Sequence, residues 1–194
     1  MSILLIPAPQ TTSFPLVYQN VDHPRSTLPP PTPRSLPEIE AVESSLTFPT
    51  FTATTAWDLG CRLRTRLLAF PTATVISISL ANSNQLLFHS VTHPGGTAPD
   101  NDSWVARKRK TVLRWGRSTW WMHCKMGGDE AAFKAKYALG ESAGEYAIHG
   151  GGVPVRVKGV EGVIGVIVVS GLKQEQDHQV VVETIKEYLA DQGS

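Results

Sequence analysis

Alternating hydrophobic and polar residues near the C-terminal end of the chain predict two successive strands. Val153, Val155 and Val157 alternate with proline or charged residues, which is the period-two pattern of a strand with one face in the core. A glycine-containing turn over 159–162 follows, and residues 163–169 then carry neither a charge nor a polar side chain. Such a run is typical of a central strand that is covered on both faces. We therefore predict a hairpin whose second strand lies in the middle of a sheet.

A helix is predicted directly after this hairpin. Glu175 and Asp177 fall in its first turns, where the helix dipole favours acidic side chains. One stripe of this helix holds His178, Val181, Val182, Ile185 and Leu189. We expect this stripe to pack on the sheet.

Similar patterns predict the remaining elements. In chain order these are a helix from Pro37, a helix over 54–69, strands over 74–80 and 86–91, a helix capped by Asn101-Asp102-Ser103, a helix over 129–139 and the start of a strand over 144–149. The short turn between the strands over 74–80 and 86–91 predicts an antiparallel hairpin. Two hairpins with helices before, between and after them indicate fold class α/β (α+β), with helices packed on a mostly antiparallel sheet.

Prolines divide the chain into two parts. Residues 1–37 hold nine of the 14 prolines. Such a segment cannot pair its backbone into regular structure and favours extended, polyproline-like conformations. We therefore predict a poorly structured, proline-rich arm over 1–37 and a single domain over 38–194. Two interpretations of the arm stay open: an unstructured tail, or an arm that lies across a neighbouring subunit or docks in the groove of a partner protein.

Charge and cysteine content narrow the class of protein. The formal net charge is +1 at pH 7, far below the basic excess that phosphate contacts require, so we expect no nucleic-acid partner. The two cysteines, Cys61 and Cys124, lack the spacing of a disulfide framework or a zinc site. No segment approaches the length of a membrane span. A cytoplasmic protein is the resulting expectation.

His178 and Asp177 are the first candidates for chemistry. A histidine near a helix N-terminus, beside the exit of a central strand, can act as a haem ligand, a general base or part of an anion site. Its place on the apolar stripe equally suits a histidine held between helix and sheet by a hydrogen bond to a backbone carbonyl. Ser170-Gly171 can form a small anion pocket in front of the helix, and Gly150-Gly151-Gly152 can either approach a ligand or permit close strand packing.

A dense set of cations lies on the helix that follows Ser103. Its members are Arg107, Lys108, Arg109, Lys110, Arg114 and Arg117. They can grip phosphates or tetrapyrrole propionates, or they can form a solvated face that pairs with acids. Arg109, with Lys108 beside it, is the preferred ligand candidate because it lies near the side of Val105 and Val112. His149 is a further candidate, but the scattered histidines lack the spacing of a dedicated metal site, so no metal is expected.

Two blocks of the sequence resemble the haem-degrading, GlcG-like domain family, which includes HbpS-like proteins and the C-terminal domain of PduO-type proteins. The first block is the glycine pair, Pro-Val strand, glycine turn, apolar strand, Ser-Gly-Leu and Asp-His order within 149–189. The second block, over 99–119, resembles the Asn-Asp-x-Trp-x-x-Arg-Lys helix of a stand-alone branch found in fungi and bacteria. The resemblance implies a three-layer, profilin-like α/β/α domain and a symmetric homo-oligomer built from dimers.

Three functions stay open at this point. The first is binding of a small anionic or tetrapyrrole (haem-like) ligand, which the resemblance implies. The second is a non-catalytic oligomeric adaptor that recruits protein partners through the proline-rich arm or a cationic surface. The resemblance points this way because the fungal branch looks like a protein associated with cytosolic chaperone or membrane-protein targeting machinery. The third is a small-metabolite enzyme with His178 as base and Arg109 holding a carboxylate or phosphate.

Overall fold

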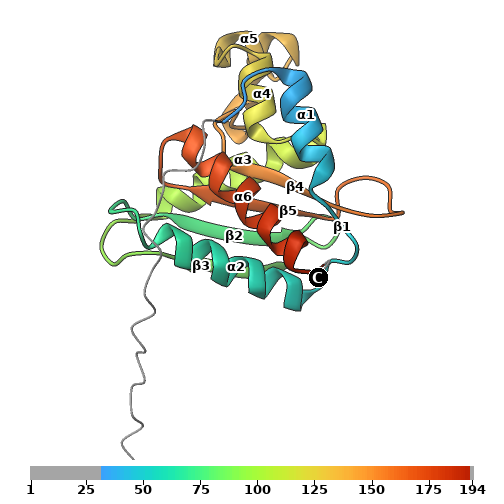
Figure 1. Ribbon diagram of the computed structural model, residues 1–194. Helices are drawn as coiled ribbons and strands as arrows, with labels where there is room; N and C mark the ends of the chain where they lie inside the picture. Colours follow the sequence, from blue (N-terminus) through green and yellow to red (C-terminus); the bar gives the residue numbers. More distant parts are fainter. Residues whose placement is uncertain (1–31, 193–194) are drawn as a thin grey trace, which may run out of the picture.

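The computed structural model describes residues 32–192, which fold around one sheet (Figure 1). The strands in this part of the chain are β1 (Thr47–Phe48), β2 (Val75–Leu80), β3 (Leu86–Val91), β4 (Gly152–Val157) and β5 (Gly165–Ser170). Their order across the sheet is β1-β4-β5-β2-β3, and every neighbouring pair is antiparallel except β1 with β4. The mostly antiparallel sheet and both hairpins confirm the predicted fold class.

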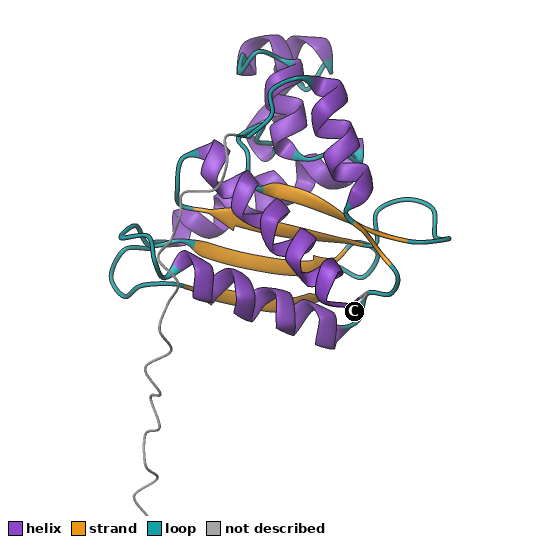
Figure 2. Cartoon of the chain, in the orientation of Figure 1, coloured by secondary structure: helices purple, strands orange, loops and turns teal. Residues whose placement is uncertain are grey.

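Helices cover both faces of the sheet. Two of them, α2 (Ala53–Leu67) and α6 (Gln174–Gln192), lie side by side on one face, and α3 (Pro99–Trp115) lies on the other (Figures 1 and 2). The sheet therefore forms the middle of three layers. This layering is the α/β/α arrangement that the family resemblance implied.

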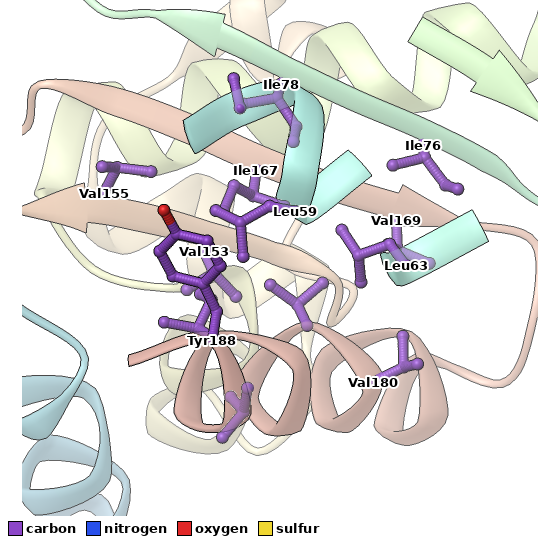
Figure 3. Close-up of a cluster of buried hydrophobic side chains, with 14 of the residues drawn as sticks. Leu59, Leu63, Ile76, Ile78, Val153, Val155, Ile167, Val169, Val180 and Tyr188 are labelled. Carbon is purple, nitrogen blue, oxygen red and sulfur yellow. The ribbon is translucent and has the colours of Figure 1, made fainter. Parts of the chain in front are cut away.

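The uncharged run predicted as a central strand forms β5. Ile167 and Val169 face α2 and α6, where they join the cluster drawn in Figure 3, and Val166 and Val168 face α3. All four side chains are at most 1% exposed. Burying a side chain of this size stabilises a fold by about 1.5–3 kcal/mol, so β5 contributes strongly to the core.

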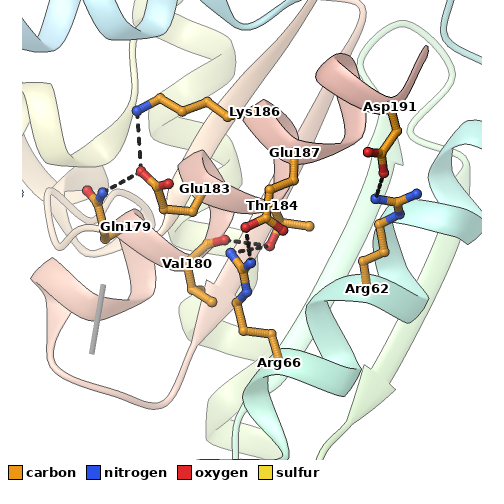
Figure 4. A network of polar contacts seen from close by, with 9 residues as sticks. All are labelled: Arg62, Arg66, Gln179, Val180, Glu183, Thr184, Lys186, Glu187 and Asp191. Carbon is orange, nitrogen blue, oxygen red and sulfur yellow. Dashed lines mark hydrogen bonds and ion pairs between the residues drawn. The ribbon is translucent and has the colours of Figure 1, made fainter. Parts of the chain in front are cut away.

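Polar side chains join α2 to α6 along their outer surfaces (Figure 4). Arg62 pairs with Asp191 and Arg66 with Glu187, and Arg66 also donates to the Thr184 hydroxyl. Exposed ion pairs of this kind each contribute about 0–1 kcal/mol. These pairs therefore add little to the stability of the fold, which comes mainly from the buried side chains between the helices and the sheet.

A second group of helices packs at one end of the sheet. Its members are α1 (Leu36–Ser45), α4 (Thr119–Lys125), α5 (Glu130–Lys136) and the 3-10 helix η1 (Gly140–Glu145). Their shared core contains Ile39, Trp120, Trp121, Met122, Phe133, Leu139, Tyr146 and Ile148. Trp120 and Trp121 are therefore buried within the chain, whereas Trp57 on α2 is 61% exposed.

Two local predictions were wrong, and one short strand was missed. No strand forms over 144–149, because Tyr146 and Ile148 bury their side chains in the helical group instead of joining the sheet. α3 begins at Pro99, before the expected caps, because proline suits the first turn of a helix and the Asn101 side chain accepts from the Ala98 N–H at 2.7 Å. The two-residue strand β1 was not predicted at all.

The predicted arm lies mostly outside the described residues. Of residues 1–37, the structure describes only those from Thr32 onward, and α1 already begins at Leu36. The arm and its boundary with the domain therefore stay predictions.

Candidate functional site

A buried polar cluster lies at the C-terminal end of β5. It contains five predicted site residues: Lys108, Ser170, Gly171, Asp177 and His178. Lys108 Nζ donates to Asp177 Oδ2 and to the Val169 carbonyl, each at 3.0 Å. The Asp177 carboxylate also accepts from the backbone N–H groups of Gly171 and Leu172. This cluster joins α3 on one face of the sheet to α6 on the other.

Burial acts on both charges of this pair. It raises the pKa of Asp177 and lowers the pKa of Lys108, while the opposite charge of each partner works against the shift. Each side chain is only 3% exposed. The pair is therefore matched inside the protein and leaves no charge available to a ligand in this conformation.

The glycines at 150–152 pack against this cluster. Gly151 has φ +119°, and a Cβ at this position would lie 2.2 Å from the Val169 carbonyl oxygen and 2.8 Å from Lys108 Nζ. The N–H groups of Gly150 and Gly152 donate to the side chains of Gln174 and Thr119. These contacts favour the structural interpretation, in which the glycines permit close packing.

His178 is enclosed rather than placed at the rim of a cleft. The residue is 2% exposed, and its ring lies 6.2 Å from that of Trp120. Burial, with a smaller effect of the Lys108 charge, lowers the pKa of His178 to about 3. Its Nδ1 has no hydrogen-bond partner among residues 32–192, so the predicted bond to a backbone carbonyl is not made through that atom. Contact between this imidazole and a ligand would require the surrounding helices to move.

Arg109 lies away from the cluster, at the opposite end of the central strands. Its Nε donates to Ser79 Oγ at 2.7 Å and its Nη2 to the Leu80 carbonyl at 2.8 Å. Leu80 pairs with Gly165, the first residue of β5, whereas the polar cluster follows the last residue of that strand. Arg109 therefore faces the sheet, as its spacing from Val105 and Val112 indicated, and it fastens α3 to the end of β2.

His149 is half-exposed at the surface. Its ring packs edge-on against Trp104 at 5.0 Å, and its Nδ1 lies 3.4 Å from Glu130 Oε1 without a hydrogen bond. Burial lowers the pKa of His149, and the Glu130 carboxylate opposes this effect. The His149 imidazole is therefore neutral at neutral pH and half-exposed beside an acid.

A pocket of about 270 Å³ opens next to His149, between α3, α5 and η1. We call it the Arg107 pocket. Its lining residues are Arg107, Glu130, Ala131, Phe133, Lys134, Ala143, Gly144, Tyr146 and Ile148. The pocket therefore combines an apolar wall with two cations and one acid.

Arg107 is held in place before any ligand arrives. Its Nε and Nη2 donate to the Tyr146 carbonyl at 3.3 and 3.1 Å, and its guanidinium carbon lies 4.4 Å from the Trp104 ring centroid. A guanidinium carries five N–H donors in a fixed planar arrangement. Donors remain on Arg107 that can bind an anion in the pocket.

The sequence indicates Arg107 as one of the cations on α3, but helical spacing favours the neighbouring Arg109 and Lys108 as ligand candidates. The i, i+3 spacing of Trp104 and Arg107 puts these two residues on one side of α3, away from the side that covers the sheet. This spacing indicates which side of α3 faces the pocket. No local pattern indicates that Glu130, Phe133 and Lys134 line the pocket, because this depends on how α5 packs near α3.

Residues 32–192 contain neither a cluster of metal ligands nor a helix that could span a membrane. In this part of the chain no group of three or more His, Cys, Asp or Glu side chains is arranged to hold a metal ion. None of the described helices is both long and apolar enough to cross a membrane.

Comparison with known proteins identifies the relatives of this chain. The sequence profile of the family described as "Haem degrading protein HbpS-like" matches residues 51–186. The chain belongs to this family. A UPF0303 protein of Streptomyces avermitilis is 39% identical over 157 residues, covering 81% of this chain and 92% of the relative. The UPF0303 protein YBR137W of Saccharomyces cerevisiae is 40% identical over 152 residues, covering 77% of this chain and 82% of the relative.

Solved structures agree with this assignment. The crystal structure of Ybr137w superimposes with a TM-score of 0.76 at 36% identity, covering 82% of this chain and 90% of that one. The crystal structure of HbpS gives a TM-score of 0.53 at 18% identity, covering 72% of this chain and 89% of that one. The likeness to HbpS at this low identity shows a shared fold. The sequence resemblance to the haem-degrading family is confirmed by these matches.

Proposed function

We propose that this HbpS-like protein binds a small organic anion in the Arg107 pocket. The observation that carries the proposal is the guanidinium of Arg107, which Tyr146 and Trp104 fix at the wall of a pocket whose other wall includes Phe133 and Ile148. A carboxylate can take the remaining Arg107 donors, since carboxylates match the planar guanidinium. The body of the ligand then contacts the apolar wall.

The charges around the pocket narrow the ligand further. Arg107 and Lys134 supply two positive charges, and Glu130 supplies one negative charge near the His149 side. Both kinds of charge can be used by a ligand that carries a carboxylate and, near it, a hydrogen-bond donor such as a hydroxyl or ammonium group. The carboxylate then contacts the cations, and the donor contacts Glu130. A ligand with several negative groups meets repulsion from Glu130.

The Arg107 pocket is small for an intact tetrapyrrole. Pockets that enclose drug-sized ligands have volumes of about 300–1,000 Å³, and the volume here is about 270 Å³. His178, the histidine that the sequence favoured as a haem ligand, is enclosed by protein. A smaller anion is therefore the better match, although the family description names haem.

Binding without catalysis agrees better with the described residues than an enzyme with His178 as its base. A general base works best when its pKa lies near the operating pH. The pKa of His178 is lowered to about 3, so its imidazole is a poor base at neutral pH. Lys108 and Asp177 are likewise occupied with each other.

A thermal-shift screen with small carboxylates tests the proposal, because a ligand that binds only the folded state raises the midpoint of unfolding. We expect some hydroxy or amino acids to raise it in the wild type and to lose most of this effect in Arg107→Gln. Hemin serves as the competing ligand. A saturable Soret shift that disappears in His149→Ala would contradict the preference for a small anion and favour haem at the pocket rim.

We also propose that the protein self-associates. Support comes from β3, a strand at the edge of the described sheet, whose Leu86 and Val91 are 56% and 40% exposed. Trp57 of α2 packs against Phe88 of the same strand and is 61% exposed. Exposed apolar side chains at an unpaired edge favour association with another chain. Sedimentation of the wild type and Trp57→Ser tests this proposal, and an unchanged monomer in both samples would contradict it.

A further inference from the structure

The first described residues of the chain lie on a surface made by α4 and α6. The indole Nε1 of Trp120 donates to the Pro33 carbonyl at 2.7 Å. Arg34 pairs with Glu175 Oε1 at 2.9 Å, and the Thr32 hydroxyl donates to the Glu175 carbonyl at 3.1 Å. Three consecutive residues of an irregular segment are thus bound by two residues of the domain.

The contacts select for arginine after an extended backbone, and proline favours that backbone. The Arg34 guanidinium carbon lies 5.1 Å from the Trp120 ring centroid, so the same indole contacts both the proline carbonyl and the cation. Proline fixes φ, and it also restricts the residue before it to extended conformations. Aromatic surfaces bind such segments because little conformational entropy is lost. We name this surface, formed by Trp120 and Glu175, the Pro-Arg site.

We propose that the Pro-Arg site is a docking site for an extended Pro-Arg segment of a partner protein, and that Thr32–Arg34 of the chain itself occupies it as a competitor. Charge complementarity supports this occupant, since Glu175 of the site meets the arginine that follows the proline. The present occupant is exchangeable because its ion pair is exposed: the Arg34 side chain is 66% exposed and that of Glu175 is 35% exposed.

Competition within the chain sets the strength of binding. A tethered segment has an effective concentration of about 1 mM, so a free peptide must exceed this value or bind more tightly than the chain's own residues. Weakening the internal segment therefore strengthens the binding of an added peptide. Arg34→Ala does this and leaves Trp120 and Glu175 unchanged.

Fluorescence anisotropy with a labelled peptide tests the proposal. The probe has the sequence of residues 27–36, Thr-Leu-Pro-Pro-Pro-Thr-Pro-Arg-Ser-Leu, and is titrated with the full chain. We expect Arg34→Ala to bind it about 5-fold or more tightly than the wild type, because competition is relieved. In the Arg34→Ala background, Glu175→Gln should weaken binding of the probe about 3-fold, and replacing the arginine of the probe by alanine should weaken it by the same factor. Combining the two changes should cause no further loss of affinity, because both remove the same ion pair.

Controls separate recognition from loss of the fold. Trp120→Phe removes the indole donor but also alters a buried side chain, so its effect counts only if the circular dichroism spectrum is unchanged. Glu183→Gln changes an acid elsewhere on α6 and should leave binding as it was. Absence of binding to Arg34→Ala, or binding that Glu175→Gln does not change, would overturn the proposal. Dissociation of a dimer by the peptide would also overturn it, because a second copy would then be the occupant.

Discussion

Lys108 Nζ lies 3.0 Å from Asp177 Oδ2 inside the protein, where each side chain is 3% exposed. The two residues come from helices on opposite faces of the sheet. Removing one charge of a buried pair leaves the other without a partner, which typically costs about 3–5 kcal/mol. Lys108→Met and Asp177→Asn should therefore each lower the free energy of unfolding by about this amount in urea denaturation.

The double variant provides the control for this pair. Lys108→Met with Asp177→Asn removes both charges, so its loss should be smaller than the sum of the two single losses by about 1 kcal/mol or more. Single losses below about 1 kcal/mol, or losses that simply add, would show that the pair does not hold α3 and α6 together.

His178 should make the protein sensitive to acid. Its pKa is lowered from 6.5 to about 3 in the folded state, so between these values the unfolded chain binds more protons than the folded one. Stability from this residue is therefore complete above about pH 6.5 and falls by up to about 1.4 kcal/mol per pH unit below it. Urea midpoints measured from pH 7 to pH 4 should decline less steeply in His178→Gln. Equal slopes in the wild type and His178→Gln would contradict a buried neutral imidazole.

Glu43 is a buried acid whose replacement should not harm the protein at neutral pH. Burial raises the pKa of Glu43, and its Oε1 has no hydrogen-bond partner among residues 32–192. The folded state therefore binds more protons than the unfolded state above pH 4.5, and the contribution of Glu43 to stability decreases as pH rises through the folded-state pKa. We expect Glu43→Gln to match or exceed wild-type stability at pH 7.5, by up to about 1 kcal/mol. If thermal unfolding shows that Glu43→Gln is instead less stable than the wild type by a similar amount, the ionised Glu43 carboxylate is needed for stability.

Gly151 should tolerate no side chain. A Cβ there would lie 2.2 Å from the Val169 carbonyl oxygen, and φ is +119°. Gly151→Ala should destabilise the protein by about 3 kcal/mol or more, because both backbone strain and a steric clash arise. Gly144→Ala is the matched control, since a Cβ at Gly144 has no neighbour within 4 Å. Similar unfolding midpoints for the two variants would contradict the close packing around Gly151.

The sequence predicted the sheet well because local patterns determine it. An uncharged, valine-rich run such as 163–169 is typical of a strand covered on both faces, and β5 occupies that place. The strand predicted over 144–149 failed because its apolar residues had a second place to be buried, among α1, α4 and α5. Periodicity cannot distinguish these two destinations.

The candidate site was predicted less completely because it depends on contacts between distant residues. Lys108 and Asp177 are 69 positions apart, and no local pattern indicates that they pair. Helical spacing correctly placed Arg109 on the inner side of α3, but that side covers the sheet rather than a cleft. The Arg107 pocket arises on another side of α3, where α5 and η1 close over it.

Titration of the ¹⁵N-labelled protein with benzoate, followed by NMR, tests anion binding in the Arg107 pocket most directly. Lys134 lines the pocket and Lys136, two residues further along α5, does not, so Lys134→Gln and Lys136→Gln form a matched pair. We expect saturable shifts of the Ala143, Gly144 and Ile148 amides, with about 3-fold to 10-fold weaker binding in Lys134→Gln, a change of about 1 kcal/mol. Lys136→Gln should bind like the wild type. Shifts confined to other parts of the domain, or equal affinities in all three proteins, would contradict the proposed site.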